Sequence, residues 1–373
     1  MIKILQINAH SGVFGGTSKF VYDVYKRIDK EQIQFDFLNF AFSTYDIVEN
    51  EIKDMGGNIY EFQLTGNIIK RKFLLFFKLK KFFKQNHYDA VHINSGSFFF
   101  SFITVFYMKI LNIKNIIVHS MNIRKYNNFQ KKMIIPLQIL LIKWSKLQLG
   151  CSYEAGAYMF GEKFAYNDSR FRCIKIGIEI KNFKFNKSIR DQYRGKLNIN
   201  NNFVIGHIGR FSYEKNHTFL IDIFKDIKKK QENAILLLIG DGPLQSNIQK
   251  KVSSMGLDES VIFLGFRNDI PEMLMCFDLF LLPSINEGIS IVGINSQASG
   301  LNTVVSTNVP KELKISDTIY FLSLNSSSKE WANFILNLPQ IVNRQNKYKN
   351  VIKAGYTIEN TVLEIEKIYE QII

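Results

Sequence analysis

The sequence predicts an α/β protein built from two doubly wound domains. At 373 residues the chain exceeds the length at which a single hydrophobic core usually stops growing, so two domains of roughly 180 residues are expected. Short continuous apolar runs alternate with longer helix-like segments in both halves of the chain. A content of 46% hydrophobic and 22% charged residues is typical of a globular protein and excludes a disordered or fibrous one.

The short apolar runs are the expected strands. They lie at 2–7, 35–40, 89–93, 116–119, 204–208, 234–239, 261–264, 279–282 and 303–306. Continuous rather than alternating apolar strands, separated by helices, indicate parallel sheets covered on both faces. A polar, weakly periodic stretch at 176–194 indicates the boundary between the two domains. We therefore expect an N-terminal domain at 1–180, a C-terminal domain at 181–355, and a last helix at 356–373 that can pack back on the first domain.

Cysteine usage and hydropathy favour a reducing cytoplasm. Cys151, Cys173 and Cys276 are far apart and near no histidine cluster, which argues against a disulfide framework or a zinc site. The first residues, MIKILQIN, are too short an apolar run for a signal peptide and are expected to form a strand. Lysines interrupt the most apolar stretches well before the roughly 20 residues that a membrane span needs.

The positive charge is concentrated in one part of the chain. The net charge is +15, and the segment 63–150 holds fifteen Lys and Arg against one acid, Asp89. Such a field indicates an anionic partner: nucleic acid, a phosphorylated acceptor, or an anionic membrane surface. Within it, 68–83 (IIKRKFLLFFKLKKFF) interleaves Phe and Leu with six cations, which predicts a helix that lies on a membrane. The alternative is a core-packed helix with a solvated basic face.

A first candidate site follows the strand at 204–208. Gly209, Arg210 and Lys215 lie at the carboxyl end of that strand, just before a helix. Arg offers a planar fork, Lys a point charge, and the helix N-terminus free N–H groups, so this loop can hold a diphosphate. The alternative is a pair of solvated surface cations.

A second candidate site follows the strand at 279–282. Glu287 stands beside Gly288, and Asn295 lies eight residues later, so a helix beginning near Gly288 would carry both side chains on one face. A carboxylate and an amide so placed can accept hydrogen bonds from vicinal sugar hydroxyls. The alternative is that Glu287 is a first-turn partner of the helix dipole.

Further features concern the strand ends. Gly15 and Gly16 precede the first helix and let backbone N–H groups approach an anion. The dinucleotide pattern G-x-G-x-x-G is absent, which disfavours an oxidoreductase. His92 and His119 end two strands of the first domain and could bind a sugar or lie in the core. No Asp-x-Asp pair follows an apolar strand, so no metal site is expected.

Taken together, these motifs resemble a known family. GHIGRFSYEKNHTFLIDIF, LLIGDGPL, VIFLGFRNDI and LLPSINEGISIVGINSQASGL, between 206 and 301, resemble the donor-binding domain of the retaining glycosyltransferase family 4. CSYEAGAYMFG at 151–161 is similar to enzymes of bacterial capsule and exopolysaccharide assembly. The first domain matches more loosely. The resemblance implies the GT-B architecture, in which two Rossmann-like domains face each other across a cleft.

The resemblance also implies roles for particular residues. Arg210 and Lys215 would bind the donor diphosphate, Glu287 the donor sugar, and Gly16 a phosphate from the other domain. The implied donor-binding set is Gly15, Gly16, Gly209, Arg210, Lys215, Gly242, Phe266, Arg267, Glu287, Gly288, Ile289, Ser290, Ile291 and Asn295. Glu287, Arg210, Lys215 and His119 are the expected catalytic residues, and transfer would proceed with retention and without a metal.

Two positions depart from the family pattern. Asn295 stands where the family has a second glutamate that holds the ribose hydroxyls. Met121, in His119-Ser120-Met121-Asn122, stands where close relatives have histidine. These changes motivate a second hypothesis, a glycosyltransferase-like subunit that binds a partner or a saccharide without catalysing. A third, nucleic-acid binding, rests on charge alone and lacks a motif, so no nucleic-acid partner is expected.

The expected function is therefore transfer of a sugar from a nucleoside diphosphate, with UDP the favoured carrier, to a lipid-linked saccharide. The nucleotide-sugar is a substrate, and no separate cofactor is expected. We expect a cytoplasmic protein, peripheral on the inner face of the plasma membrane, with an anionic membrane surface and a glycosyltransferase subunit as further candidate partners.

Overall fold

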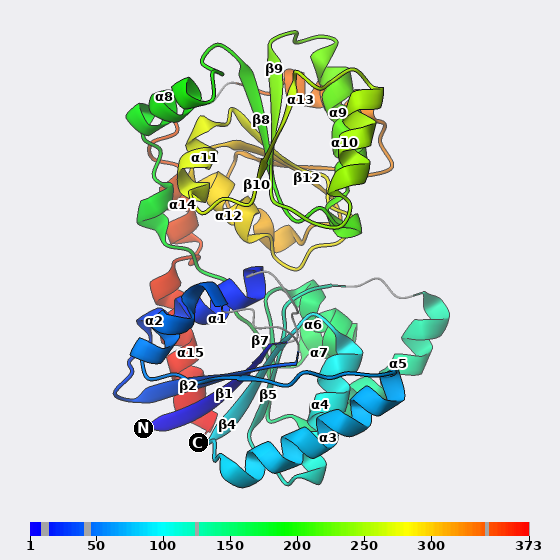
Figure 1. Cartoon of the computed structure of the whole chain (residues 1–373), viewed down its shortest axis with the longest axis vertical. Coiled ribbons are helices and arrows are strands. Elements are labelled where there is room, and N and C mark those ends of the chain that lie inside the picture. Colours follow the sequence, from blue (N-terminus) through cyan, green and yellow to red (C-terminus); the bar gives the residue numbers. More distant parts are fainter. Residues whose placement is uncertain (9–14, 41–45, 124–126, 340–342, 373) are drawn as a thin grey trace. The chain divides into compact units, whose positions relative to one another are not determined.

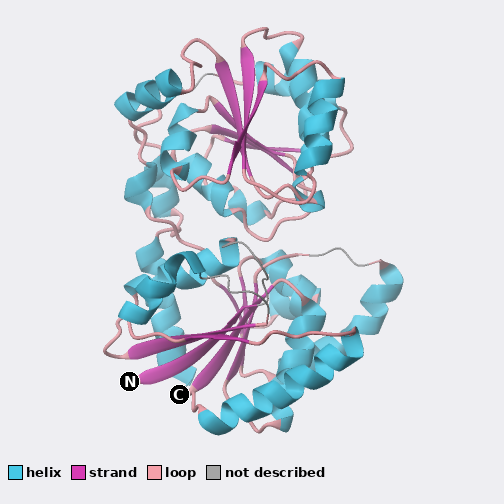
Figure 2. Cartoon of the chain, viewed as in Figure 1, coloured by secondary structure: helices cyan, strands magenta, loops and turns pink. Residues whose placement is uncertain are grey.

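The computed structural model describes residues 1–8, 15–40, 46–123, 127–339 and 343–372. The chain forms two compact units. The first comprises Met1–Gly177 and Ile358–Ile373, and the second comprises Ile178–Thr357. The first crossing between the units falls inside the polar stretch 176–194, and the chain returns to the first unit at its last helix. Figure 2 shows a group of strands in each unit.

The first unit is a doubly wound α/β domain. Within the described residues, its seven strands are all paired in parallel, in the order β3-β2-β1-β4-β5-β6-β7. The strands are β1 (Ile2–Asn8), β2 (Ile33–Asn39), β3 (Ile59–Glu61), β4 (Ala90–Ser95), β5 (Ile116–Ser120), β6 (Leu147–Gly150) and β7 (Phe171–Cys173). The helices are α1 (Gly16–Arg27), η1 (Asp46–Val48), α2 (Glu49–Asp54), α3 (Ile68–Gln85), α4 (Phe98–Ile110), α5 (Asn128–Trp144), α6 (Tyr153–Phe160), α7 (Glu162–Asn167) and α15 (Ile358–Ile372).

The second unit repeats this plan. Its six described strands are paired in parallel, in the order β10-β9-β8-β11-β12-β13. The strands are β8 (Phe203–Ile208), β9 (Ala234–Ile239), β10 (Val261–Gly265), β11 (Leu279–Leu282), β12 (Asn302–Ser306) and β13 (Ile319–Leu322). The helices are η2 (Ile180–Phe183), α8 (Lys187–Lys196), η3 (Tyr213–Lys215), α9 (His217–Lys228), α10 (Gln245–Ser254), α11 (Ile270–Cys276), α12 (Ile291–Ala298), η4 (Lys311–Leu313), α13 (Ser328–Leu336) and α14 (Tyr348–Lys353).

The central strands are apolar because both faces of each sheet are covered. Every residue of β4, β5, β9, β11 and β12 is buried. In the first unit, α3, α4 and α5 contribute Leu79, Val105 and Leu141 to one core that also contains strand residues Val91 and Ile93. The two doubly wound domains expected from the apolar runs are confirmed.

The last helix is tied to the first sheet by a buried polar network. The Tyr369 hydroxyl of α15 accepts a hydrogen bond from Gln6 Nε2 at 2.8 Å and lies 2.7 Å from His92 Nδ1. Asn94 Nδ2 donates to Gln6 Oε1 at 2.8 Å. Helix α15 therefore completes the core of the first unit.

Among the described residues, no helix combines the length and the apolar character needed to cross a membrane.

Candidate active site

The candidate donor site lies where the strand order of the second sheet reverses. β8 and β11 are neighbours in that sheet although the strands β9 and β10 lie between them in the chain. Their outgoing loops diverge to opposite sides of the sheet, and such switch points are where open α/β sheets bind ligands. Arg210 and Lys215 follow β8, and Glu287 follows β11. The fold thus brings together the two loops singled out by the sequence.

Lys215 and Glu287 form an ion pair between these loops. Lys215 Nζ donates to Glu287 Oε1, and the side chains are only 19% and 12% exposed. Ser284 Oγ donates to the same carboxylate oxygen at 2.9 Å. The backbone joins the loops as well, because Ile285 N donates to Glu214 O at 2.7 Å. Lys215 has three N–H donors, so it can hold Glu287 and still donate to a phosphate.

The expected position of Glu287 on a helix is wrong. Helix α12 begins at Ile291, and the Ser290 side chain caps it by accepting from Gly293 N at 3.2 Å. Glu287 therefore stands in the loop, four residues before the helix, and cannot be a first-turn partner of its dipole. Glu287 and Asn295 do not share a helix face as expected, because Ser290 is the N-cap and the helix begins only at Ile291. Between them, Gly288 and Ile289 are buried.

Asn295 occupies a buried position in α12. Its side chain is only 6% exposed, and its Oδ1 has no hydrogen-bond partner among the described residues. A buried amide oxygen without a partner costs about 1–3 kcal/mol relative to one that is hydrogen-bonded. Asn295 Oδ1 is therefore a buried acceptor whose hydrogen-bonding capacity is not used by the described residues.

Glycines allow the loops after β8 and β9 to touch. Gly240 has φ +129°, and a Cβ there would lie 2.2 Å from Gly209 O. Gly242 has φ +150°, and a Cβ there would lie 2.7 Å from Phe211 O. Phe211 N in turn donates to Asp241 O at 2.7 Å. The turn Gly240-Asp241-Gly242 thus packs directly on the backbone of the Arg210 loop and holds it in place.

Two buried histidines support this loop, and the sequence analysis missed both. His207 and His217 have ring centroids 4.6 Å apart, and Phe211 stacks on His217 at 4.1 Å. His207 Nδ1 donates to Leu281 O at 2.8 Å. Burial, then the Lys215 ammonium, lower the pKa of His217 to about 4. Their isolated positions in the sequence gave no signal, since their pairing depends on how β8 and α9 pack.

The loop after β10 carries Phe266 and Arg267, two residues expected to bind the donor. Phe266 is half-exposed and available for contact. The Arg267 guanidinium is engaged by its neighbour Asp269, with Nε to Oδ1 at 2.7 Å. The charge of Arg267 is therefore balanced by Asp269, so this loop does not offer a nucleotide an unpaired guanidinium.

The first unit places its candidate residues at the carboxyl edge of its sheet. Gly15 is the N-cap of α1 and Gly16 its first residue, while residues 9–14 of the same loop lie outside the described residues. His119 is fully buried, with the Phe20 ring edge-on at 5.7 Å. Neither of its ring nitrogens has a partner among the described residues. Burial lowers the pKa of His119 to about 3, so the imidazole is neutral at physiological pH.

His119 belongs to a row of polar residues across four strands. Asn39, Asn8, Asn94 and His119 are in register on β2, β1, β4 and β5. Both amide atoms of Asn39 and the Oδ1 of Asn94 are also buried without partners among the described residues. The structure thus shows no hydrogen-bond partner for His119 among the described residues, and both roles that the sequence left open for it stay predictions.

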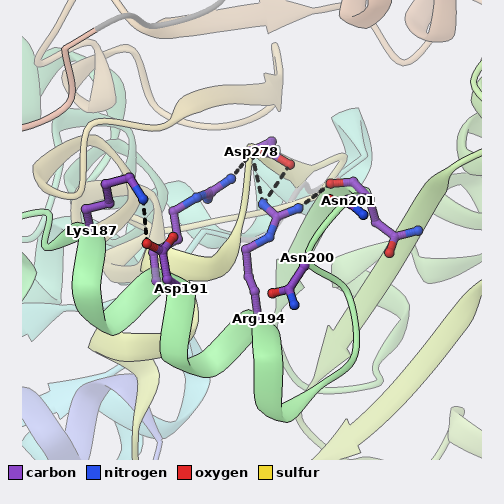
Figure 3. Close-up of a pocket in the computed structure, with 8 residues that line it drawn as sticks. Lys187, Asp191, Arg194, Asn200, Asn201 and Asp278 are labelled. Carbon is purple, nitrogen blue, oxygen red and sulfur yellow. Dashed lines mark hydrogen bonds and ion pairs between the residues drawn. The ribbon is translucent and has the colours of Figure 1, made fainter.

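A pocket of 630 Å³ lies at the other end of the second sheet, beside the start of β8 and β11. Figure 3 shows Arg194 directed at Asp278, and Lys187 paired with Asp191. Arg190 also donates to Asp278, at 2.5 Å, and Asp278 accepts from Val204 N at 2.8 Å. These charges are used to join α8 to the amino end of the sheet, so we assign this pocket a structural role.

The family of the second unit follows from sequence comparison. Residues 189–357 match the family described as Glycosyl transferases group 1. The second unit is a glycosyltransferase domain. The match spans β8 to β13, and so includes Arg210, Lys215, Glu287 and Asn295.

Relatives align over most of the chain. EpsF of Bacillus subtilis (strain 168) is 26% identical over 365 residues, covering 95% of this chain and 93% of EpsF. The capsular polysaccharide biosynthesis glycosyltransferase CapH of Staphylococcus aureus is 26% identical, covering 99% of both chains. The UDP-Gal:alpha-D-GlcNAc-diphosphoundecaprenol alpha-1,3-galactosyltransferase of Escherichia coli is 24% identical, covering 73% of this chain and 77% of the enzyme.

A solved structure shares the whole fold of this chain. The crystal structure of Anabaena Alr3699/HepE in complex with UDP and glucose superposes with a TM-score of 0.78 at 17% sequence identity, and covers 100% of both chains. The expected GT-B fold, with its two Rossmann-like domains, is confirmed.

The neutral state of His119 predicts a pH-dependent stability. The folded pKa of about 3 lies below the ordinary value of 6.5, so only the unfolded chain takes up this proton as the pH falls from 6.5 toward 3. The contribution of neutral His119 to the free energy of unfolding is therefore complete above pH 6.5 and declines below it. Relative to a His119→Phe variant, the wild type should lose about 2 kcal/mol of unfolding free energy between pH 7 and pH 5.

Urea unfolding of both proteins at the two pH values measures this difference. The exposed His87, changed to Phe, is the control for replacing a histidine with phenylalanine in the same unit. A difference between wild type and His119→Phe that is the same at pH 7 and pH 5 would contradict a neutral buried His119.

Proposed function

We propose that this protein transfers a sugar from a UDP-sugar to a saccharide carried on a lipid diphosphate, in the synthesis of a cell-surface polysaccharide. The observation that carries the proposal is the Lys215–Glu287 pair at the β8/β11 switch point, within a glycosyltransferase domain. The pair sets a cation for the donor diphosphate beside a carboxylate for the donor sugar.

The residues have distinct tasks in this reaction. The bond between sugar C1 and the diphosphate oxygen breaks, C1 bonds to the acceptor hydroxyl oxygen, and the hydroxyl proton passes to the departing diphosphate. Arg210 and Lys215 stabilise the negative charge that develops on the leaving group. Glu287, oriented by Lys215 and Ser284, accepts hydrogen bonds from the sugar hydroxyls. In this proposal the two cations take the place of a metal ion, and the new bond keeps the anomeric configuration of the donor.

The relatives support the proposed acceptor class. The Escherichia coli relative is named for a diphosphoundecaprenol acceptor and a UDP-sugar donor, and the Staphylococcus aureus relative for capsular polysaccharide biosynthesis. We propose that the protein works in the cytoplasm, at the inner face of the plasma membrane, where a UDP-sugar in solution and a lipid-borne acceptor can meet.

A second function remains open because of two residues. Asn295 and Met121 replace a glutamate and a histidine expected from the family pattern, and both are buried. A subunit that binds the nucleotide or a partner glycosyltransferase without catalysing would be compatible with these changes. Transfer or hydrolysis of a UDP-sugar by the purified protein separates the two functions.

Arg210 and Lys215 form the proposed diphosphate clamp, and removing either cation should weaken binding of UDP. Each charge-assisted contact to a phosphate contributes on the order of 1.5–3 kcal/mol, so Arg210→Ala and Lys215→Ala should each lower affinity by roughly ten- to hundred-fold. Calorimetric titration with UDP measures the effect. Lys250→Ala, which removes an exposed lysine of α10, is the matched control. Wild-type affinity in both clamp variants would show that the diphosphate binds elsewhere.

Restoring a carboxylate at position 295 should tighten nucleotide binding. A glutamate accepts hydrogen bonds from both ribose hydroxyls, whereas Asn295 offers one acceptor and a donor. Asn295→Glu should therefore raise UDP affinity by about 1–2 kcal/mol and increase any transfer activity. Asn295→Gln has the length of glutamate without its charge and is the control. If Asn295→Glu has no effect and the wild type binds no sugar nucleotide, the non-catalytic function is the better account.

A further inference from the structure

Three helices of the first unit form a single layer over one face of its sheet. The rings of Phe76 in α3 and Tyr107 in α4 have centroids 5.3 Å apart. Phe106 of α4 and Trp144 of α5 have ring centroids 5.8 Å apart. Figure 1 shows these helices beside one another. The order across the layer is therefore α3, α4, α5.

The outer side of α4 is apolar along its whole length. Phe99, Phe106 and Ile110 are exposed, and Ile103 between them is partly exposed. Spacings of four, three and four residues put these side chains on one stripe of the helix. The opposite side of the helix is buried in the core. A surface helix normally presents polar residues to water, whereas the exposed side of α4 carries apolar side chains.

The two flanking helices extend this apolar stripe. Each side chain concerned has at least 40% of its surface exposed. The outer apolar surface consists of Phe73 and Phe77 on α3, Phe99, Phe106 and Ile110 on α4, and Ile139 on α5. Large contiguous apolar surface on a protein marks an interaction site.

The charges around this surface have one sign. None of the three helix sequences contains Asp or Glu. The exposed cations of the flanking helices are Lys70, Arg71, Lys72, Lys80, Lys81 and Lys84 on α3, and Lys132 and Lys143 on α5. A second copy of the chain docked on this face would bring these cations together without any acid to offset them.

The contacts of α3 change the expectation for this helix. Leu75, Leu79 and Phe82 are buried in the core, so the apolar face that could have entered a membrane is already covered. What α3 presents outward is mainly lysine, with Phe73 and Phe77 among the cations. Helix α3 can thus supply attraction to an anionic surface, whereas apolar contact must come chiefly from α4 and α5.

We propose that the outer apolar surface docks on an anionic lipid bilayer, with the side chains of α4 and α5 entering the headgroup boundary and the lysines of α3 contacting the headgroups. A bilayer offers negative charge and an apolar interior together, which matches both features of this surface. The inference deepens the proposed function, because a lipid-linked acceptor would lie in the same membrane. Vesicle binding requires neither donor nor acceptor, so it can fail or succeed independently of sugar transfer.

Co-sedimentation with vesicles tests the two components separately. Wild-type protein should bind vesicles that contain phosphatidylglycerol more strongly than pure phosphatidylcholine vesicles, and less strongly as salt rises. Phe99→Ser combined with Ile139→Ser should lower the partition coefficient roughly tenfold or more, since each removes inserted apolar area. Lys80→Gln combined with Lys84→Gln should lower the partition coefficient on anionic vesicles by about 25-fold, at about fivefold per lysine.

Matched controls come from the same unit. Leu363→Ser removes an exposed leucine on α15, and Lys163→Gln removes an exposed lysine on α7. Both should bind like wild type, and all variants should keep the wild-type melting temperature. Wild-type binding by the Phe99/Ile139 variant would overturn the proposal. A dimer in light scattering that dissociates in that variant would overturn it too, by assigning the surface to a second copy.

Discussion

The ion pair between Lys215 and Glu287 is the interaction on which the candidate site depends. It joins the loop after β8 to the loop after β11, which leave the sheet at its switch point. Both side chains are largely withdrawn from water, and removal of one partner from such a pair can cost several kcal/mol because the other charge is left uncompensated. The pair therefore fixes the positions of a cation and a carboxylate before any ligand arrives.

Much of the surrounding structure serves to hold these two loops. Gly240 and Gly242 permit the close approach of the β9 loop to the Arg210 loop. His207 lies against Gly209, and His207 and His217 pack together as neutral rings, where a charged side chain would repel Lys215. A site preorganised in this way need not rearrange when charge develops on a departing diphosphate.

The two units carry different surface chemistry. The second unit contains the charged residues of the candidate donor site, whereas α3, α4 and α5 of the first unit combine exposed apolar side chains with cations and no acid. The polar row from Asn39 to His119 lies at the carboxyl edge of the first sheet. Tyr369 of the last helix is hydrogen-bonded to Gln6 on β1 of the same sheet. Each unit therefore contributes a feature suited to one substrate of the proposed reaction.

The sequence predicted the features that depend on local pattern. Buried parallel strands are continuous apolar runs, so both sheets and the loops that hold Arg210, Lys215 and Glu287 could be located. Contacts between distant segments could not be predicted. Ser290 caps α12 three residues after Glu287, which moved the helix start to Ile291. The His207–His217 pair and the exposed side of α4 depend on how helices pack on the sheets, which apolar periodicity does not specify.

The central claim is that the second unit holds a nucleoside diphosphate through its terminal phosphate. Calorimetric titration of the wild-type protein with UDP and with UMP tests this most directly, because the two ligands differ only in that phosphate. Contacts from Arg210 and Lys215 predict that UDP binds at least about tenfold more tightly than UMP. Equal affinities for UDP and UMP would contradict the assignment of these residues to the diphosphate.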